Sequence, residues 1–428
     1  MISKNKVFAL SSLALLAATL GGCGGKTADL TIWCPAVDGQ VMDALVKNFK
    51  AANPDYADKV FSVVATHAEG DVQADVKKDK TVAGDVFCLA DDNIRAAVDA
   101  DTLLKLDDAD KTAVATSDGK DAVDACSIDG DLYGYPYRAD NSTLLIYNKK
   151  IVSDEQAKTL DGILAACAAN NAQFYWDLAN GWYNPAPFWG NGVTQKLTKD
   201  DKGIEQIDTT LYSTKGVEAA EALMATYFNN KTSFQISSDQ ATIEAGFADG
   251  KAGACIFWND TATIEAKIVA AGGEMGVAHL PSITIGSKQV EMKSFLGYKA
   301  IAINNYVVEK GEETVTLAKK FAKYLASKEA QEIRIQLGYG PSNLEVAGTS
   351  EAKTLPWVAA INAQRNLGGT VGQAANVTGN FWDPMATIGT QIKNATKLGD
   401  WGTYGTAKKM LKSVVTTAGW VATEFIEN

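Results

Sequence analysis

Short apolar segments alternate with amphipathic segments at the start of the chain, and this alternation constrains the fold more than any other feature. Residues 29–34, 60–65 and 85–89 read as buried strands, because each is a brief apolar run bounded by polar or turn-forming residues. Between the first two runs, apolar residues recur at helical spacing until Pro54 ends the pattern. Strands separated by helices in this way favour a parallel, doubly wound sheet.

A second set of such segments follows after a polar step in the chain. We interpret the polar residues 138–142, which lie between two apolar strands, as a hinge crossing. The further elements that the pattern predicts are strands at 130–136, 143–148, 253–258 and 295–303, helices at 160–169, 216–228, 238–248 and 315–325, and a helix capped by Ser327.

The length of the chain indicates more than one lobe. Its 428 residues exceed the roughly 250–300 at which single hydrophobic cores stop growing. The sequence therefore predicts an α/β protein of two lobes, each built on a doubly wound sheet, joined by hinge strands. The expected ranges are 28–139 plus 295–338 for the N-terminal lobe and 140–294 plus 339–428 for the C-terminal lobe.

The N-terminus has the pattern of a secretory signal peptide. Two lysines precede an apolar run at residues 7–20, which is too short to span a bilayer, so we expect residues 1–22 to be removed. The stretch Leu20-Gly21-Gly22-Cys23 resembles the lipobox of bacterial lipoproteins, which implies a lipid on Cys23 and a tether at 23–27. The alternative is an ordinary secretory signal with a chance cysteine. We expect an extracytoplasmic protein anchored to the outer face of the cell membrane, because two acyl chains suffice for stable anchoring.

Charge and motif content exclude several classes of function. A formal net charge of −11 makes nucleic acid a poor partner. His67 and His279 are the only histidines and neither lies in a zinc-binding pattern. Neither a phosphate-binding glycine loop nor a nucleophile elbow occurs. We therefore expect no metal, no cofactor and no catalytic residue.

Five cysteines follow Cys23, without a CxxC pair among them. Cys34 and Cys88 end two strands of the first sheet, so their sulfur atoms could reach bridging distance if those strands are neighbours. The alternative is that both pack as small, reduced core residues.

Three separated stretches carry a resemblance to a known family. They are residues 30–33 through 85–92, residues 130–148 with Tyr135-Pro136 and Leu145-Ile146-Tyr147-Asn148, and residues 321–331 followed by Gly340-Pro341-Ser342-Asn343 and Phe381-Trp382. Together they resemble the extracellular solute-binding proteins (family 1) of carbohydrate ABC transporters, most closely the maltose- and malto-oligosaccharide-binding proteins. The resemblance implies a type II periplasmic-binding-protein-like fold, a carbohydrate ligand between the lobes, the permease of an ATP-driven importer as partner, and a monomer.

The resemblance also implies which residues hold the sugar. A sugar ring offers apolar faces to aromatic rings and hydroxyls to carboxylates and amides. The matching positions are Asp38, Asp92, Asp140, Trp182, Tyr183, Trp258, Phe381 and Trp382. Asp92 and Asp140 are expected just after strands, at the carboxyl edge where open α/β sheets bind ligands. Asp38 is shifted by one residue from the family position and could instead cap a helix that begins near Gly39.

The sequence departs from the family pattern at two places, and two other functions are alternatives to sugar transport. Cys88-Leu89 stand where the maltose branch has an aromatic residue, and Asn93 replaces a basic residue, so one stacking surface is lost. Three other tryptophans, Trp176, Trp189 and Trp401, are treated as structural. A surface-anchored glycosidase would also place carboxylates around a sugar, and a receptor for a peptide or polyamine could use a similar fold.

Replacing Cys23 by alanine should abolish lipid attachment and leave folding intact, because the lobes are expected to begin only near Ala28. Cell fractionation and a thermal melt of the released protein measure both effects. Full retention of the Cys23→Ala protein in the membrane fraction would contradict the lipoprotein assignment.

Overall fold

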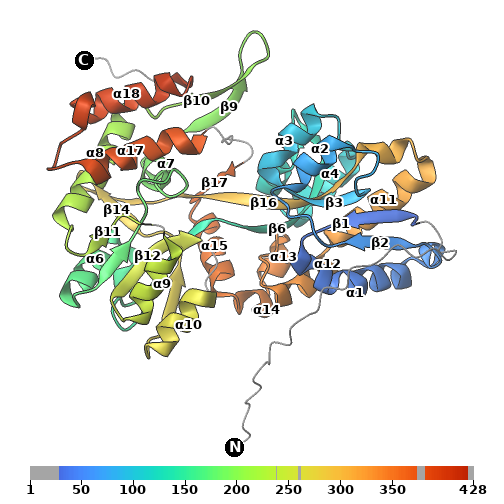
Figure 1. The fold of residues 1–428 in the computed structure, drawn as a ribbon, viewed down its shortest axis with the longest axis horizontal. Helices are drawn as coiled ribbons and strands as arrows, with labels where there is room; N and C mark the ends of the chain where they lie inside the picture. Colours follow the sequence, from blue (N-terminus) through green and yellow to red (C-terminus); the bar gives the residue numbers. More distant parts are fainter. Residues whose placement is uncertain (1–27, 238, 259–261, 374–380, 423–428) are drawn as a thin grey trace, which may run out of the picture.

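Two α/β lobes make up the described part of the protein, a computed structural model that describes residues 28–237, 239–258, 262–373 and 381–422. Figure 1 shows the lobes side by side, with β6 (Gly134–Asn141) and β16 (Ser294–Ile303) running between them. We call the body that holds β1 (Leu30–Trp33) the first lobe and the body that holds β12 (Ala252–Trp258) the second lobe. The predicted two-lobed α/β fold is confirmed, whereas the residue ranges assigned to the lobes stay a prediction.

The first lobe is built on a sheet of order β17-β16-β3-β1-β2, and β6 also pairs with β16. β1, β2 and β3 are parallel, as their alternation with helices predicts. β16 runs antiparallel to both β3 and β6. The elements of this lobe are β2 (Phe61–Val64), β3 (Val86–Ala90), β17 (Thr370–Gly372), α1 (Ala36–Ala52), α2 (Val72–Lys78), α3 (Ile94–Asp99), α4 (Asp108–Ser117), α5 (Lys120–Ala125), α11 (Glu312–Leu325) and α12 (Lys328–Arg334).

Helix α1 shows why the local sequence forms this layer. Val41, Met42 and Leu45 are buried on one face of the helix, and the helix ends before Pro54, as the apolar spacing predicts. The predicted cap of α12 is also confirmed, because the Ser327 hydroxyl accepts a hydrogen bond from the amide of Ala330.

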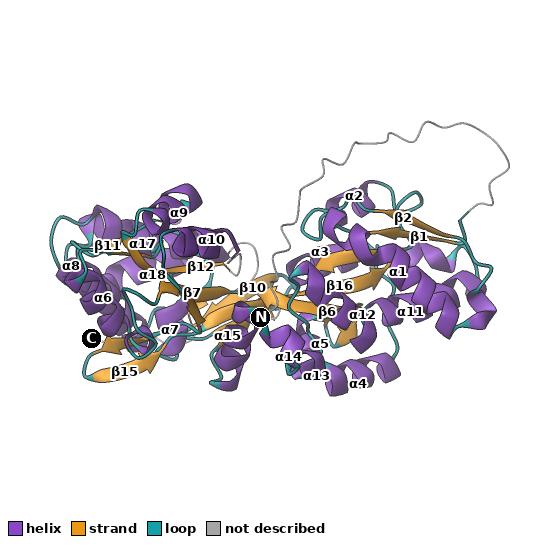
Figure 2. Cartoon of the chain, turned by 90° about the horizontal axis from the view of Figure 1, so that it is seen from below, coloured by secondary structure: helices purple, strands orange, loops and turns teal. Residues whose placement is uncertain are grey.

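The second lobe is built on a mixed sheet of order β11-β8-β12-β7-β13, in which β7 runs antiparallel to both of its neighbours. Figure 2 shows helices on both sides of this sheet. The elements are β7 (Thr143–Asn148), β8 (Gln173–Tyr175), β11 (Phe234–Gln235), β13 (Met275–Ala278), α6 (Leu160–Ala169), α7 (Ala186–Gly190), α8 (Thr214–Asn229), α9 (Gln240–Ala248), α10 (Ala262–Ala270), α15 (Pro356–Asn366), α17 (Trp382–Asn394) and α18 (Ala407–Thr417).

The hinge crossing differs in one respect from the prediction. Strand β6 continues through the polar residues to Asn141, and Ser142 alone separates it from β7. The Ser142 hydroxyl donates to the carbonyl of Phe295 (2.8 Å), and the amide of Thr143 donates to the hydroxyl of Ser294 (3.0 Å). These bonds connect the start of β7 to β16. The polar residues up to Asn141 therefore lie in strand β6 and do not form a loop.

The lobes also contact each other beside the hinge. A small hydrophobic cluster joins Ala122 of α5 to Trp357 of α15 around Leu296 and Tyr298 of β16. The hairpin of β9 (Gln195–Lys199) and β10 (Glu205–Thr209) forms two further contacts, as its Glu205 pairs with Arg95 at 2.6 Å and its Lys199 with Asp129 at 2.8 Å. A cavity of about 340 Å³ lies between these contacts, lined by α5, β9, β16 and β17, and contains none of the predicted ligand residues.

The five described cysteines are free and buried, so the Cys34–Cys88 disulfide is absent from this structure. Burial, together with the nearby Asp38 carboxylate, raises the pKa of the Cys34 thiol to about 12. Both residues pack as small core side chains, the alternative that the sequence left open. In the described ranges, no helix has the length and apolar character that crossing a membrane requires. Cys23 and the predicted signal peptide lie outside these ranges.

Candidate functional site

Three of the predicted tryptophans come together in the second lobe. Trp182 stacks on Trp382 with ring centroids 3.8 Å apart and planes inclined by 17°. Trp258, the last residue of β12, lies 5.8 Å from the Trp182 ring. Phe295 of β16 contacts all three rings at 5.3–5.8 Å. Residues from β12, β16, α17 and the loop after β8 thus form one aromatic cluster.

Accessibility divides the predicted aromatic residues into two groups. Trp182 and Trp258 are half-buried, so part of each ring remains available to a ligand. Trp382 is only 5% exposed, and Tyr183 and Phe381 are 2% exposed each. Phe381 instead stacks between two other tryptophan rings of the second lobe. The accessible aromatic surface of this cluster therefore consists of Trp182 and Trp258.

The loop that carries Trp182 is held tightly against the start of α17. A Cβ on Gly181 would lie 1.8 Å from the carbonyl oxygen of Trp382, so only glycine allows this approach. The buried amide of Asn184 donates to the carbonyls of Leu178 and Met385. Sequence reasoning missed Phe295, because an apolar residue in a predicted strand carries no mark that distinguishes a cluster member from ordinary core.

In the first lobe, Asp92 lies where the sequence placed it. It follows β3 in a short helical turn, Asp91–Asn93, and its side chain is exposed. The Gln373 amide donates to the Asp92 carboxylate (2.9 Å) and in turn accepts from Asn141 of β6 (3.1 Å). Asp92 therefore has an ordered carboxylate at the carboxyl edge of the first sheet.

Asp38 is buried and bonded within the protein, and it is not open to solvent. Its side chain is completely buried, and the Nε of Arg334, itself 1% exposed, donates to Asp38 at 2.7 Å. The suggestion that Asp38 caps a helix beginning near Gly39 is wrong, because α1 begins at Ala36 and Asp38 lies in its first turn. With Arg334 on one oxygen and the Tyr137 hydroxyl 3.5 Å from the other, the carboxylate is already engaged within the protein.

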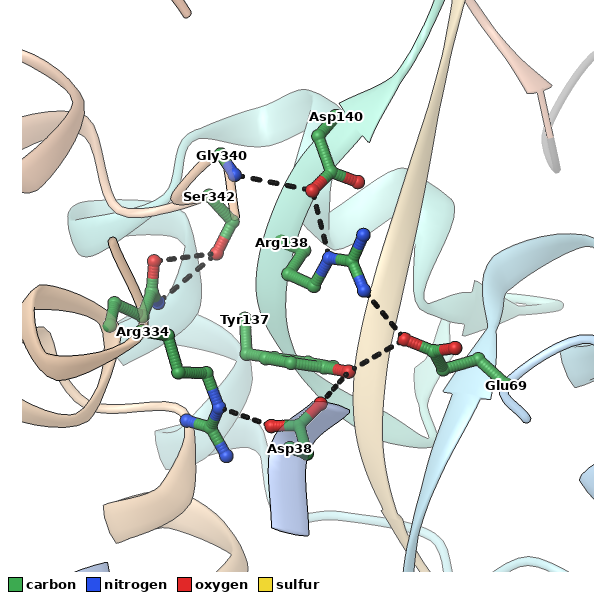
Figure 3. Close-up of polar contacts among 9 residues, drawn as sticks. Asp38, Glu69, Tyr137, Arg138, Asp140, Arg334, Gly340 and Ser342 are labelled. Carbon is green, nitrogen blue, oxygen red and sulfur yellow. Dashed lines mark hydrogen bonds and ion pairs between the residues drawn. The ribbon is translucent and has the colours of Figure 1, made fainter. Parts of the chain in front are cut away.

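Asp140 was expected just after the hinge strand, and that placement is wrong because β6 extends to Asn141 and includes it. The carboxylate accepts a hydrogen bond from Arg138 Nε at 2.8 Å and another from the amide of Gly340 at 3.2 Å (Figure 3). The polar residues after Tyr137 continue the ladder because β16 supplies a partner strand, which local sequence could not reveal.

Arg138 and Glu69 were not predicted as site residues. Figure 3 shows them in a chain of polar contacts that runs from Asp140 through Arg138 and Glu69 to Tyr137 and Asp38. Arg138 Nη1 donates to Glu69 at 2.7 Å, and the Tyr137 hydroxyl donates to the same oxygen at 3.1 Å. The only sequence signals for these residues were a charged residue at the start of the polar step 138–142 and an acid shortly after the second strand.

Asp91, the residue before the predicted ligand Asp92, is a buried acid with two backbone donors. The amides of Tyr298 and Asp92 donate to its two oxygens at 2.8 and 2.9 Å. Burial, together with the neighbouring Asp92 carboxylate, raises the pKa of the Asp91 carboxyl to about 7.

Comparison with known proteins identifies one matching family. The family described as "Bacterial extracellular solute-binding protein" matches residues 44–360. Among curated proteins, none matches the sequence.

Solved structures share the fold over nearly the whole chain. A maltodextrin-binding protein from L. casei, solved without ligand, has 22% identity and a TM-score of 0.75, covering 91% of this chain and 98% of that one. A maltose-binding periplasmic protein from Listeria monocytogenes in complex with maltose has 19% identity and a TM-score of 0.68 over 91% and 98%. A structure described as "with acarbose" has 27% identity and a TM-score of 0.71 over 92% and 99%.

Replacing Asp38 by alanine should lower the free energy of unfolding by about 3–5 kcal/mol, because it leaves the buried guanidinium of Arg334 without its counter-charge. Urea unfolding measures the loss. The double variant Asp38→Leu/Arg334→Met should be more stable than Asp38→Ala, since it removes both charges. A wild-type unfolding midpoint for Asp38→Ala would show that the ion pair does not hold this region.

The raised pKa of Asp91 predicts a pH-dependent stability. The folded protein keeps a proton on Asp91 up to about pH 7, whereas the unfolded chain releases it near pH 4, so this group favours folding at low pH and loses that effect as pH rises from about 4 to 7. The free energy of unfolding of the wild type, measured relative to Asp91→Asn, should fall by up to roughly 1.4 kcal/mol per pH unit in this window. Urea unfolding at pH 5 and pH 8 tests the prediction, and an equal difference at both values would contradict it.

Proposed function

The chain belongs to the bacterial extracellular solute-binding protein family, and from that premise we propose that it captures a carbohydrate between its lobes for an ABC importer. The proposed ligand is an oligosaccharide of the maltose and maltodextrin class, which the protein would deliver to the transmembrane permease. We further propose that the protein is a monomeric lipoprotein, anchored to the outer face of the cell membrane through Cys23.

The observation that carries the carbohydrate proposal is the accessible pair Trp182 and Trp258 in the second lobe. Half-buried indole rings offer the flat apolar surface on which the C–H faces of a sugar ring stack. The first lobe presents Asp92 and the Asp140–Arg138–Glu69 chain, whose oxygens and nitrogens suit the hydroxyls at the edge of such a ring. The names of the similar structures, which mention maltodextrin, maltose and acarbose, support the same class of ligand.

The arrangement of the acids favours a carrier over a glycosidase. Glycoside hydrolysis needs one carboxyl group that donates a proton and a second that attacks or activates water. Asp38 and Asp140 each accept a hydrogen bond from an arginine, so both carboxylates are already engaged by neighbouring side chains. The family and two of the similar structures are described as binding proteins.

The test is a thermal stabilisation screen of the purified protein, followed by titration calorimetry and product analysis. Maltotriose should raise the melting temperature, whereas xylotriose, a galacto-oligosaccharide, a tripeptide and spermidine serve as competing classes. Maltotriose recovered unchanged after incubation supports a carrier, and release of glucose would establish a hydrolase. Stabilisation by spermidine or the peptide instead of any sugar would overturn the proposal.

Two tryptophans of the cluster should respond differently to truncation. Trp258→Ala should weaken maltotriose binding by about 1–2 kcal/mol, or roughly 5- to 30-fold, with a small change in the melting temperature of the empty protein. Trp382→Ala should cost about 3–5 kcal/mol of folding stability, because its ring is buried beneath Trp182. Calorimetric titrations alongside thermal melts separate the two effects, and wild-type affinity in Trp258→Ala would remove that ring from the site.

A further inference from the structure

Phe295 lies near the start of β16, where this strand meets the second lobe, and its side chain is completely buried. Its ring contacts those of Trp182, Trp258 and Trp382 at interplanar angles of 64°, 71° and 62°. The ring centroids are 5.3–5.8 Å apart, within the range that edge-to-face aromatic pairs prefer. One buried ring therefore contacts both accessible tryptophans and the buried one.

Hydrogen bonds hold the backbone at Phe295 to the second lobe. The carbonyl of Phe295 accepts a hydrogen bond from the Ser142 hydroxyl. The neighbouring hydroxyl of Ser294 accepts one from the amide of Thr143. Thr143 is in turn the register partner of Trp258 in the ladder between β7 and β12. The strands themselves therefore fix where the Phe295 ring lies relative to Trp258.

The two accessible rings form two differently inclined surfaces, because Trp182 and Trp258 meet at an angle of 58°. Each ring is half-buried, so part of it faces solvent while the rest packs in the cluster. An indole that rotates freely loses that freedom when a sugar stacks on it, and this loss weakens binding. Phe295 restricts both rings before a ligand arrives, together with Trp382 behind Trp182 and Tyr183 at the edge of Trp258.

Burial alone does not distinguish Phe295 from other phenylalanines of the second lobe. Phe247 of α9 is also completely buried and belongs to the same hydrophobic core. In the described part of the chain, however, the Phe247 ring contacts neither Trp182 nor Trp258. If Phe295 had only a structural role, the two phenylalanines would be equivalent for ligand binding, so Phe247 provides a matched comparison.

Resting on the proposed carbohydrate function, we propose that Phe295 is a positioning residue for sugar binding, whose ring holds Trp182 and Trp258 at the angle at which they stack on the ligand. Because its side chain is completely buried, Phe295 acts through the two indole rings and not by touching the sugar. The strand that carries it also pairs with β3 and β6 in the first lobe, so Phe295 connects the stacking surface of one lobe to the sheet of the other.

The test compares Phe295→Leu with Phe247→Leu in the full mature protein, with maltotriose as the probe in titration calorimetry. Leucine keeps an apolar side chain and removes the aromatic ring. Both variants should melt at lower temperature than the wild type, because each loses a buried ring. Phe295→Leu should also weaken maltotriose binding about 3- to 10-fold, since the indole rings then become ordered only on binding. Phe247→Leu should bind within about twofold of the wild type.

Near-ultraviolet circular dichroism of the empty, folded proteins gives a readout that a general loss of stability does not change. The tryptophan bands depend on how the indole rings of the cluster are oriented relative to one another. Phe295→Leu should alter these bands, whereas Phe247→Leu should leave them as in the wild type. Wild-type bands in Phe295→Leu would show that Phe295 does not set the orientation of the rings.

A double-mutant cycle with Trp258→Ala shows whether Phe295 acts through the accessible rings. In the absence of the Trp258 ring, Phe295→Leu should cost less affinity than it does in the wild type, and an undiminished cost would overturn the inference. If Phe295→Leu binds maltotriose within about twofold of the wild type, or if both leucine variants lose affinity equally, the inference is wrong and the carbohydrate function stands. If the wild type binds no malto-oligosaccharide, the proposed function itself fails, while the spectra still test whether Phe295 orients the rings.

Discussion

The pairing of β16 with β6 and β3 is the constraint on which the rest of this structure depends. β16 lies between these two strands and runs antiparallel to both, which brings a segment from late in the chain into the middle of the first sheet. The same strand extends into the second lobe, where Phe295 enters the aromatic cluster. Because β16 is one continuous strand, it positions both candidate surfaces, which are the aromatic cluster of the second lobe and the polar residues of the first lobe.

The buried ion pair of Asp38 and Arg334 reinforces this frame at a different point. It joins the first turn of α1 to the end of α12 in a site from which water is excluded, so each charge depends on the other. Tyr137 of β6 lies within reach of the same carboxylate and also contacts Glu69. The network thus divides into a closed part at Asp38 and Arg334 and a more accessible part at Arg138 and Glu69.

Much of the fold could be predicted because it follows from local periodicity. The apolar face of α1, the strands β1 to β3, the helix α6 and the cap at Ser327 are visible in short windows of sequence, and the structure has them where they were predicted. The strand β6 could not be bounded in the same way. Its polar residues look like a loop until β16 provides hydrogen-bond partners, so the position of Asp140 was misjudged.

The residues of the candidate site could likewise be predicted only in part from local sequence. The sequence by itself determined the alternation of strands and helices, the two-lobed α/β class and the set of aromatic and acidic residues from which a sugar site could be built, because periodicity and resemblance are properties of short segments. Only the tertiary structure decided which of those residues are accessible: it buried Trp382 beneath Trp182, engaged Asp38 with Arg334, and placed Glu69 beside Arg138. The physical reason is that burial and ion pairing depend on contacts between segments far apart in the chain, and no local pattern records which partner a side chain will meet.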